Sequence, residues 1–105
     1  KSGKVSLGKQ DSTHALCSGS TDAHIRADRV YVRVYLDQSS TGKSGSWGTI
    51  DYWTGTATNA SVATASSGSY KVTKNQYYRA TGAHSVTEGT TTESTDTTSS
   101  ALLFN

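Results

Sequence analysis

Alternation of apolar and polar residues is the dominant pattern along the chain, and it is clearest over residues 29–36. The apolar positions of this segment are Val30, Val32, Val34 and Leu36. A period of two places them on one face of a β-strand, which is predicted to face the core. Tyr31 and Tyr35 lie on the opposite face, where they predict a second, semi-polar surface that something else covers.

The remaining apolar segments also have the period of strands, because Thr, Val, Tyr and Ser dominate them and good helix formers are scarce. Loops or turns are predicted at residues 39–46, 66–69 and 74–76. Glu88 and Gly89 are predicted to form a two-residue hairpin tip, since Gly supplies the positive φ that such tips need. That register would place Thr87 opposite Thr90 and His84 opposite Glu93. Further strands are predicted at residues 5–7, 13–17, 47–54, 56–65, 70–73, 77–87, 90–98 and 101–104.

Short strands separated by frequent turn signals favour an all-β fold, namely a single antiparallel β-sandwich of about six to nine short strands. Residues 1–105 are expected to form one domain. Within it, residues 1–20 are expected to form an N-terminal arm and residues 99–105 a C-terminal strand.

Composition makes this expected core thin. The chain has 17 Ser, 17 Thr and 10 Gly among 105 residues, and no Pro or Met. Ten basic and eight acidic residues are interspersed and give a net charge of +2, which argues against a nucleic-acid-binding or anionic-membrane surface. No stretch approaches the length of apolar residues that a membrane span needs.

The compartment is expected to be extracellular. The chain begins at Lys1 without a charged and apolar leader, as a secreted protein does after its signal peptide is removed. Cys17 is the only cysteine, so an intramolecular disulfide is excluded. Few cysteines with abundant Ser, Thr, Gly and Tyr are typical of exported proteins of Gram-positive bacteria.

Candidate catalytic and metal-binding motifs are weak, so the protein is predicted not to be an enzyme and to need no cofactor. His14 and Cys17 have the spacing of two metal ligands, but no second pair completes a tetrahedral set. No nucleophile elbow, phosphate-binding loop or calcium loop occurs. The spacing of the carboxylates singles out no pair for glycoside chemistry.

The aromatic residues Trp47, Tyr52 and Trp53 follow a Gly-containing loop within one short segment. Exposed rings in such a place could stack on sugar faces, which predicts a glycan-binding site. The alternative is that at least one Trp fills a core that is poor in Leu and Ile, and this alternative is favoured.

The C-terminal third carries a recognisable motif: Tyr-Tyr-Arg-Ala-Thr-Gly-Ala-His from residue 77, followed by a Thr-Glu-Ser return strand that ends near Ser94. It resembles a group of small uncharacterised secreted β-domain proteins of Gram-positive bacteria. The resemblance implies an exported single β domain and implies no catalytic residue.

Together these patterns predict an extracellular, self-associating structural subunit of a surface filament or coat, because Thr- and Ser-rich strands without Pro can pair with neighbouring copies. Leu102, Leu103 and Phe104 are candidates for a strand donated to a neighbour, and Cys17, if exposed, for a bridge between chains. The alternative is a secreted carbohydrate-binding or adhesive module for cell-wall or host glycans, and a small antimicrobial protein is a third hypothesis.

Overall fold

The computed structural model describes residues 2–105 as six β-strands, with no helix among them. All pairings are antiparallel, so the predicted all-β class and the antiparallel arrangement are confirmed. The strands are β1 (Ser2–Asp11), β2 (His14–Ser39), β3 (Gly48–Lys71), β4 (Gln76–Glu88), β5 (Thr91–Thr98) and β6 (Leu102–Phe104).

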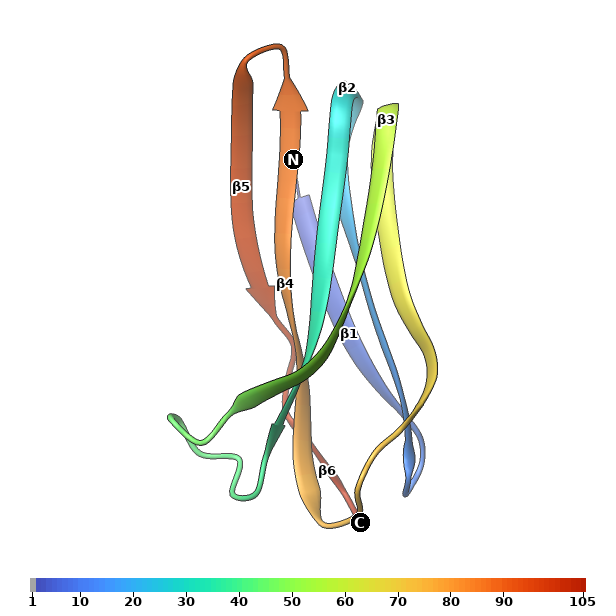
Figure 1. The fold of residues 1–105 in the computed structure, drawn as a ribbon, viewed down its shortest axis with the longest axis vertical. Coiled ribbons are helices and arrows are strands. Elements are labelled where there is room, and N and C mark those ends of the chain that lie inside the picture. The colour runs from blue at the N-terminus through green and yellow to red at the C-terminus, as the bar shows by residue number, and fades with distance from the viewer. Residues whose placement is uncertain (1) are drawn as a thin grey trace.

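The six strands form one sheet that curls into a half-barrel, as Figure 1 shows. β2 lies at its centre: residues 14–22 pair with β1 and the end of β3, and residues 27–39 pair with β4 and the start of β3. β5 and β6 pair with β4. We call residues 2–11, 14–22 and 62–71 the back limb, and residues 27–39, 48–60 and 76–104 the front limb.

Two bends let the long strands β2 and β3 pass from one limb to the other. His24 in β2 and Asn59 in β3 have φ angles of 70° and 49°, and the register between the strands shifts between Asp22 and Ala27. His and Asn are among the residues that tolerate this left-handed conformation. The prediction of uniformly short strands is wrong for β2 and β3. The loop predicted at residues 66–69 lies within β3, where Gly68 has a φ of 63° and pairing with β2 continues across a bulge.

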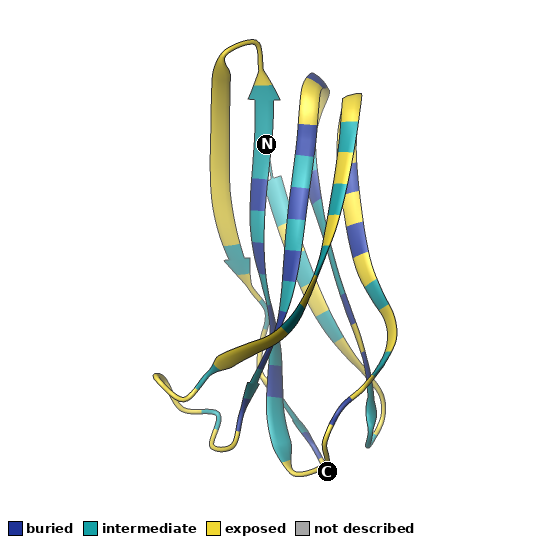
Figure 2. Ribbon diagram, viewed as in Figure 1, coloured by how far each residue is buried: buried dark blue, intermediate teal, exposed yellow. Residues whose placement is uncertain are grey.

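The core lies inside the curl and is built of small and β-branched side chains. The alternation predicted at residues 29–36 is confirmed, since its four apolar side chains are fully buried. Figure 2 shows the same alternation of buried and partly exposed residues along β2 and β4. The buried apolar residues are Ala15, Cys17, Ala23, Ala27, Val30, Val32, Val34, Leu36, Ala63, Ala65, Val72, Tyr78, Ala80 and Phe104.

One buried polar cluster joins the two limbs across this interior. The Thr21 hydroxyl donates to the carbonyl oxygen of Tyr31 at 2.9 Å and lies 2.8 Å from Nδ1 of His84. Because its single hydrogen is already used, the Thr21 oxygen must accept from Nδ1–H, and Nε2 of His84 then accepts from the Thr97 hydroxyl at 2.6 Å. In the neutral ring, which desolvation favours by lowering the pKa of His84, this network assigns the hydrogen to Nδ1.

The limbs also meet where only glycine fits. Gly55 of β3 faces inward, and a Cβ at that position would collide with the backbone carbonyl of Thr64 in the other half of the same strand. Backbone cannot rotate away as a side chain can, so glycine at this position permits the close approach of the limbs.

The β4–β5 hairpin exists, but its predicted register is wrong. Glu88 is still paired, with Thr91, so the two loop residues are Gly89 and Thr90, and His84 faces Thr95 instead of Glu93. Gly89 has a φ of 61° at the first loop position, which fits a type II′ turn.

The chain ends lie within the sheet as far as they are described. From residue 2 onward, the expected N-terminal arm forms β1 and the start of β2, and the expected C-terminal strand contains β6 at Leu102–Phe104. No helix in residues 2–105 is long and apolar enough to cross a membrane.

Candidate functional site

The candidate site is the outer face of the front limb, opposite the buried valines of β2. Four rows of residues cross this face, each taken from β3, β2, β4 and β5 in that order. The rows are Thr58, Arg29, Thr87 and Thr92; Thr56, Tyr31, Ser85 and Ser94; Thr54, Arg33, Ala83 and Asp96; and Tyr52, Tyr35, Thr81 and Thr98. The face is therefore rich in hydroxyl groups, with arginine and tyrosine along its middle.

Arginine and tyrosine side chains stack on one another along this face, and we call Arg29, Tyr31, Arg33 and Tyr52 the Arg–Tyr ladder. The guanidinium of Arg29 lies 5.2 Å from the ring centre of Tyr31, and that of Arg33 lies 5.1 Å from the ring of Tyr52. Nε of Arg33 also donates to the Tyr31 hydroxyl at 2.9 Å. Hydrogen bonds with Tyr35 and then with Tyr31 raise the pKa of Arg33. The ladder thus holds positive charges in fixed positions.

Beyond the ladder, toward the C-terminal end of β2, Asp37 and its register partner Arg79 extend the same face. Asp37 has a side chain only 5% exposed, and it pairs with Nε of Arg79 at 3.2 Å. It also accepts hydrogen bonds from the hydroxyls of Thr49 at 2.7 Å and Thr81 at 3.2 Å. Because this buried carboxylate has three partners, it fixes the orientation of the Arg79 guanidinium.

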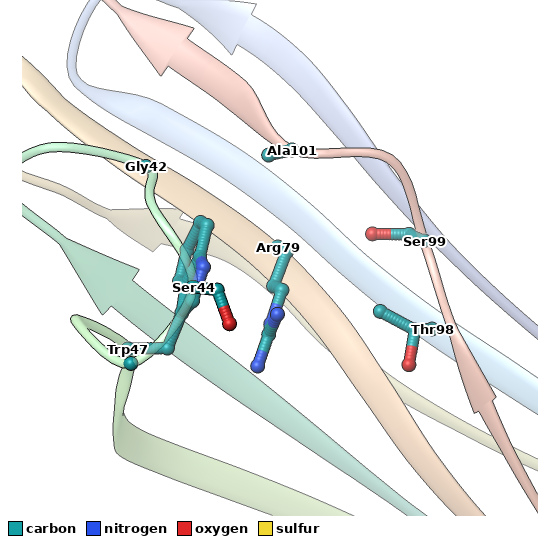
Figure 3. Close-up of a pocket in the computed structure, with 8 residues that line it drawn as sticks. Gly42, Ser44, Trp47, Arg79, Thr98, Ser99 and Ala101 are labelled. Atoms are coloured by element: carbon teal, nitrogen blue, oxygen red, sulfur yellow. The ribbon is translucent and has the colours of Figure 1, made fainter.

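Arg79 in turn stacks on Trp47, with its guanidinium 4.4 Å from the ring centre (Figure 3). The two side chains stand in an open cleft of about 510 Å³ between the β2–β3 loop and the end of β5. The lining residues are Gly42, Ser44, Gly45, Trp47, Arg79, Thr98, Ser99 and Ala101. The cleft continues the outer face toward the loop end of the molecule.

The three aromatic residues of the predicted glycan site do not lie together. Tyr52 is 55% exposed on the ladder, and Trp47 lies in the cleft. Trp53 points to the opposite side of β3, where it packs against the core and meets Tyr70 edge-on at 5.3 Å. The favoured alternative, that at least one Trp supports the core, holds for Trp53.

The residues predicted for assembly lie inside their own fold. Cys17 is fully buried, and burial, followed by the charge of Asp37, raises the pKa of its thiol to about 12. Leu102, Leu103 and Phe104 form β6, which pairs with β4 of the same chain, and the Phe104 ring packs edge-on against Tyr78 at 5.3 Å. A bridge through Cys17 or a donated C-terminal strand would therefore require this structure to open.

The three histidines are dispersed. His84 belongs to the buried cluster, where desolvation lowers its pKa against the opposing charge of Asp96. Nδ1 of His14 lies 2.9 Å from Asp11, and His24 lies beside Asp22 at the bend of β2. No group of three His, Cys, Asp or Glu side chains that could hold a metal ion occurs in residues 2–105.

The two edge strands of the front limb, β3 and β5, are a second feature of interest, and we call their unpaired sides its margins. Among the described residues, β3 pairs only with β2 and β5 only with β4, so each has one free margin. The 24 residues of β3 include two charged side chains, Asp51 and Lys71, and exposed Ile50 and Tyr52. Long, nearly uncharged edges of this kind favour pairing with another strand.

Sequence reasoning missed the ladder as a unit and missed Asp37 and Arg79 altogether. The alternation of Arg29, Tyr31, Arg33 and Tyr35 along one face carried a signal for the ladder. No local signal pairs residues 37 and 79, because only the register between β2 and β4 brings them together.

Comparison with known proteins adds family membership to this geometry. No curated protein and no solved structure matches the chain. A family model described as a family of unknown function (DUF6147) matches residues 1–102, and the chain therefore belongs to that family.

Proposed function

We propose that the protein is a secreted structural subunit whose copies join side by side by pairing β5 of one copy with β3 of the next. The observation that carries this proposal is the matching chemistry of the two margins, where Thr58 and Thr56 share rows with Thr92 and Ser94. β3 and β5 contribute to the same four rows of the front limb, at its two opposite margins. A copy displaced sideways, without shift along the strands, brings the two margins into register.

The strand directions agree with such a displacement. β3 runs antiparallel to β2, β4 antiparallel to β2, and β5 antiparallel to β4, so β5 is antiparallel to β3 of the displaced copy. Thr58 would then face Thr92, and Thr56 would face Ser94. Cross-strand pairs of Thr with Thr or Ser are favourable, at about 0.2–1 kcal/mol each.

Charge favours this pairing over the symmetric pairing of two β5 strands. β5 carries Glu93 and Asp96 and no basic residue, so a β5–β5 contact would bring four acidic side chains to one seam. Like charges on adjacent strands repel each other. A β5–β3 contact joins unlike surfaces, and such heterologous contacts produce open-ended assemblies when the rotation does not close a ring.

We also infer that each subunit acts as a two-layer sandwich in the extracellular space. The buried bond between Thr21 and His84 and the contact of Gly55 with Thr64 support two facing layers. The hydroxyl-rich surface and the resemblance to exported proteins support the location. Immunoblots of culture medium, cell wall and cytosol from the producing organism test it, and confinement to the cytosol would exclude it.

Paired charges test the register of the proposed contact. In a Thr56→Lys/Ser94→Lys variant, like charges meet at every contact, whereas in Thr56→Lys/Ser94→Glu opposite charges meet. Sedimentation velocity over a range of concentrations is expected to show open-ended growth for the natural chain and the Lys/Glu variant, and monomers for the Lys/Lys variant.

Ser40→Lys with Ser94→Lys is the matched control, because Ser40 is exposed in the loop between β2 and β3 and lies outside both margins. It adds the same charge without placing a lysine on the β3 margin. A natural chain that stays monomeric at all concentrations, or equal behaviour of the Lys/Lys and Lys/Glu variants, would refute the proposed contact.

A further inference from the structure

We propose that the outer face of the front limb binds a polysaccharide that carries carboxylate groups, along the line from Arg29 through Arg33 to the Arg79–Trp47 pair. This binding is separate from self-association, because one copy of the chain holds the whole line.

The arginines are regularly spaced along this line. Arg29 and Arg33 are four residues apart on β2, and Arg79 is the register partner of Asp37, four residues further on. At about 3.3 Å per residue, each of these arginine rows lies about 13 Å from the next along the strands. A single small anion cannot span them, whereas an extended polymer with repeated anionic groups can.

The guanidinium groups are held ready to bind. Arg33 is fixed by the Tyr31 hydroxyl at 2.9 Å and by the ring of Tyr52, and Arg79 by Asp37 and Trp47. Side chains that are already ordered lose less entropy on binding. Guanidinium groups also match the planar, bidentate geometry of a carboxylate.

The aromatic rings between the arginines supply contacts for the sugar rings themselves. Tyr52 is 55% exposed, and Trp47 lines the open cleft. Flat rings pack on the apolar faces of pyranoses. The exposed hydroxyls of Thr54 and Thr56 flank the ladder on β3 and can hydrogen-bond to the polymer.

The distribution of acids sets the path of the polymer. Asp37 is buried and paired with Nε of Arg79, so the two charges largely offset each other; Arg79 contributes N–H donors, and Arg29 and Arg33 contribute the positive charge of the line. Asp96 is exposed in the row of Arg33 but lies on β5, two strands away from β2. The polymer is therefore expected to run over β2 and β3 past Arg29 and Arg33, and then to cross to Arg79 on β4 without approaching Asp96.

Nucleic acid fits this face less well. Duplex DNA carries a negative charge about every 1.7 Å of its axis, far more densely than this line places cations. The whole chain has a net charge of only +2. A sparse cationic line with interleaved tyrosines is better matched to a polymer with one charge on each sugar and a large apolar area.

Calorimetric titration of the protein with polygalacturonate tests the proposal, with fully methyl-esterified polygalacturonan as the uncharged probe of the same backbone. Polygalacturonate is expected to bind, more weakly as salt increases, and the ester is expected to bind at least about tenfold more weakly. Arg33→Gln is expected to weaken polygalacturonate binding by about tenfold or more, because it removes a charge-assisted contact.

Lys4→Gln is the matched control, since Lys4 is an exposed cation on β1 in the back limb and lies outside the outer face of the front limb. It is expected to leave binding unchanged, and circular dichroism should show that both variants fold. Equal binding of the ester, equal loss in the two variants, no binding of polygalacturonate, or tighter binding of single-stranded DNA would each overturn the proposal.

Discussion

His84 on β4 and Thr21 on β2 are joined across the interior of the curled sheet by a hydrogen bond of 2.8 Å between Nδ1 and Oγ1. This bond links the back limb to the front limb and leaves His84 with its other nitrogen accepting from Thr97. Stability of the fold is thereby tied to the protonation state of one buried side chain.

The first prediction is that the free energy of unfolding decreases as the pH is lowered, because of His84. Desolvation lowers the pKa of His84 in the folded chain, against the opposing influence of Asp96. The unfolded chain then binds the proton more readily, so acid favours unfolding. The contribution of His84 is present above its ordinary pKa of about 6.5 and is lost as pH falls below that value toward the lower folded pKa.

Urea unfolding at a series of pH values between about 7.5 and 4.5 measures this loss. A His84→Gln variant should show a smaller decrease in the free energy of unfolding over the same range. An identical slope in the variant would mean that other groups cause the pH dependence.

The second prediction concerns the buried carboxylate of Asp37. Asp37→Asn removes the charge that pairs with Arg79 and weakens the hydrogen bonds from Thr49 and Thr81. We expect a loss of about 1.5–3 kcal/mol in the free energy of unfolding. Because Arg79 is then no longer fixed on Trp47, the Trp fluorescence of the folded variant should also change.

Glu88→Gln is the control for this prediction, since Glu88 is exposed at the end of β4. It should change stability by less than about 0.5 kcal/mol. Equal effects of the two substitutions would show that Asp37 has no special structural role.

The third prediction tests the close approach of the limbs at Gly55. Gly55→Ala places a methyl group against the carbonyl of Thr64 and should cost about 1–3 kcal/mol or prevent folding. Gly48→Ala is the matched control, because a Cβ at Gly48 meets nothing within 4 Å. Thermal unfolding of both variants compares them, and a Gly55→Ala variant as stable as the natural chain would show that the limbs are further apart.

The fourth prediction concerns Cys17. Its thiol is fully buried and its pKa is raised to about 12, so the folded chain should react with a disulfide reagent at pH 8 at least about a hundredfold more slowly than the unfolded chain. Absorbance after mixing, with and without denaturant, measures both rates. Rapid reaction of the folded chain would mean that Cys17 reaches the surface and would restore it as a candidate for a bridge between chains.

Local patterns predicted much of the fold. The buried face of residues 29–36, the loop near residues 39–46 and the strand at residues 77–87 follow from alternation and turn residues, which act over short distances. The same patterns misjudged β3, because the Ser- and Gly-rich residues 66–69 form a bulge within the strand without ending its pairing.

The candidate site was predicted only in part, because local patterns do not specify which residues of different strands come together. Trp47, Tyr52 and Trp53 were predicted together as an alternative glycan site, but Trp53 faces inward and Trp47 is half-buried. Asp37 and Arg79 are 42 positions apart, and their pairing depends on the register of two strands that no local pattern specifies. Gly55 likewise has a role only when the two limbs face each other.

Amide hydrogen exchange, measured on the natural chain at low and at high protein concentration, tests the proposed assembly most directly. Pairing of β5 with β3 of a neighbour predicts that exchange slows at high concentration in residues 52–58 and 91–98 together, and that the Thr56→Lys/Ser94→Lys variant loses this effect. Exchange in both segments that does not depend on concentration would contradict the proposal that these margins join copies of the chain.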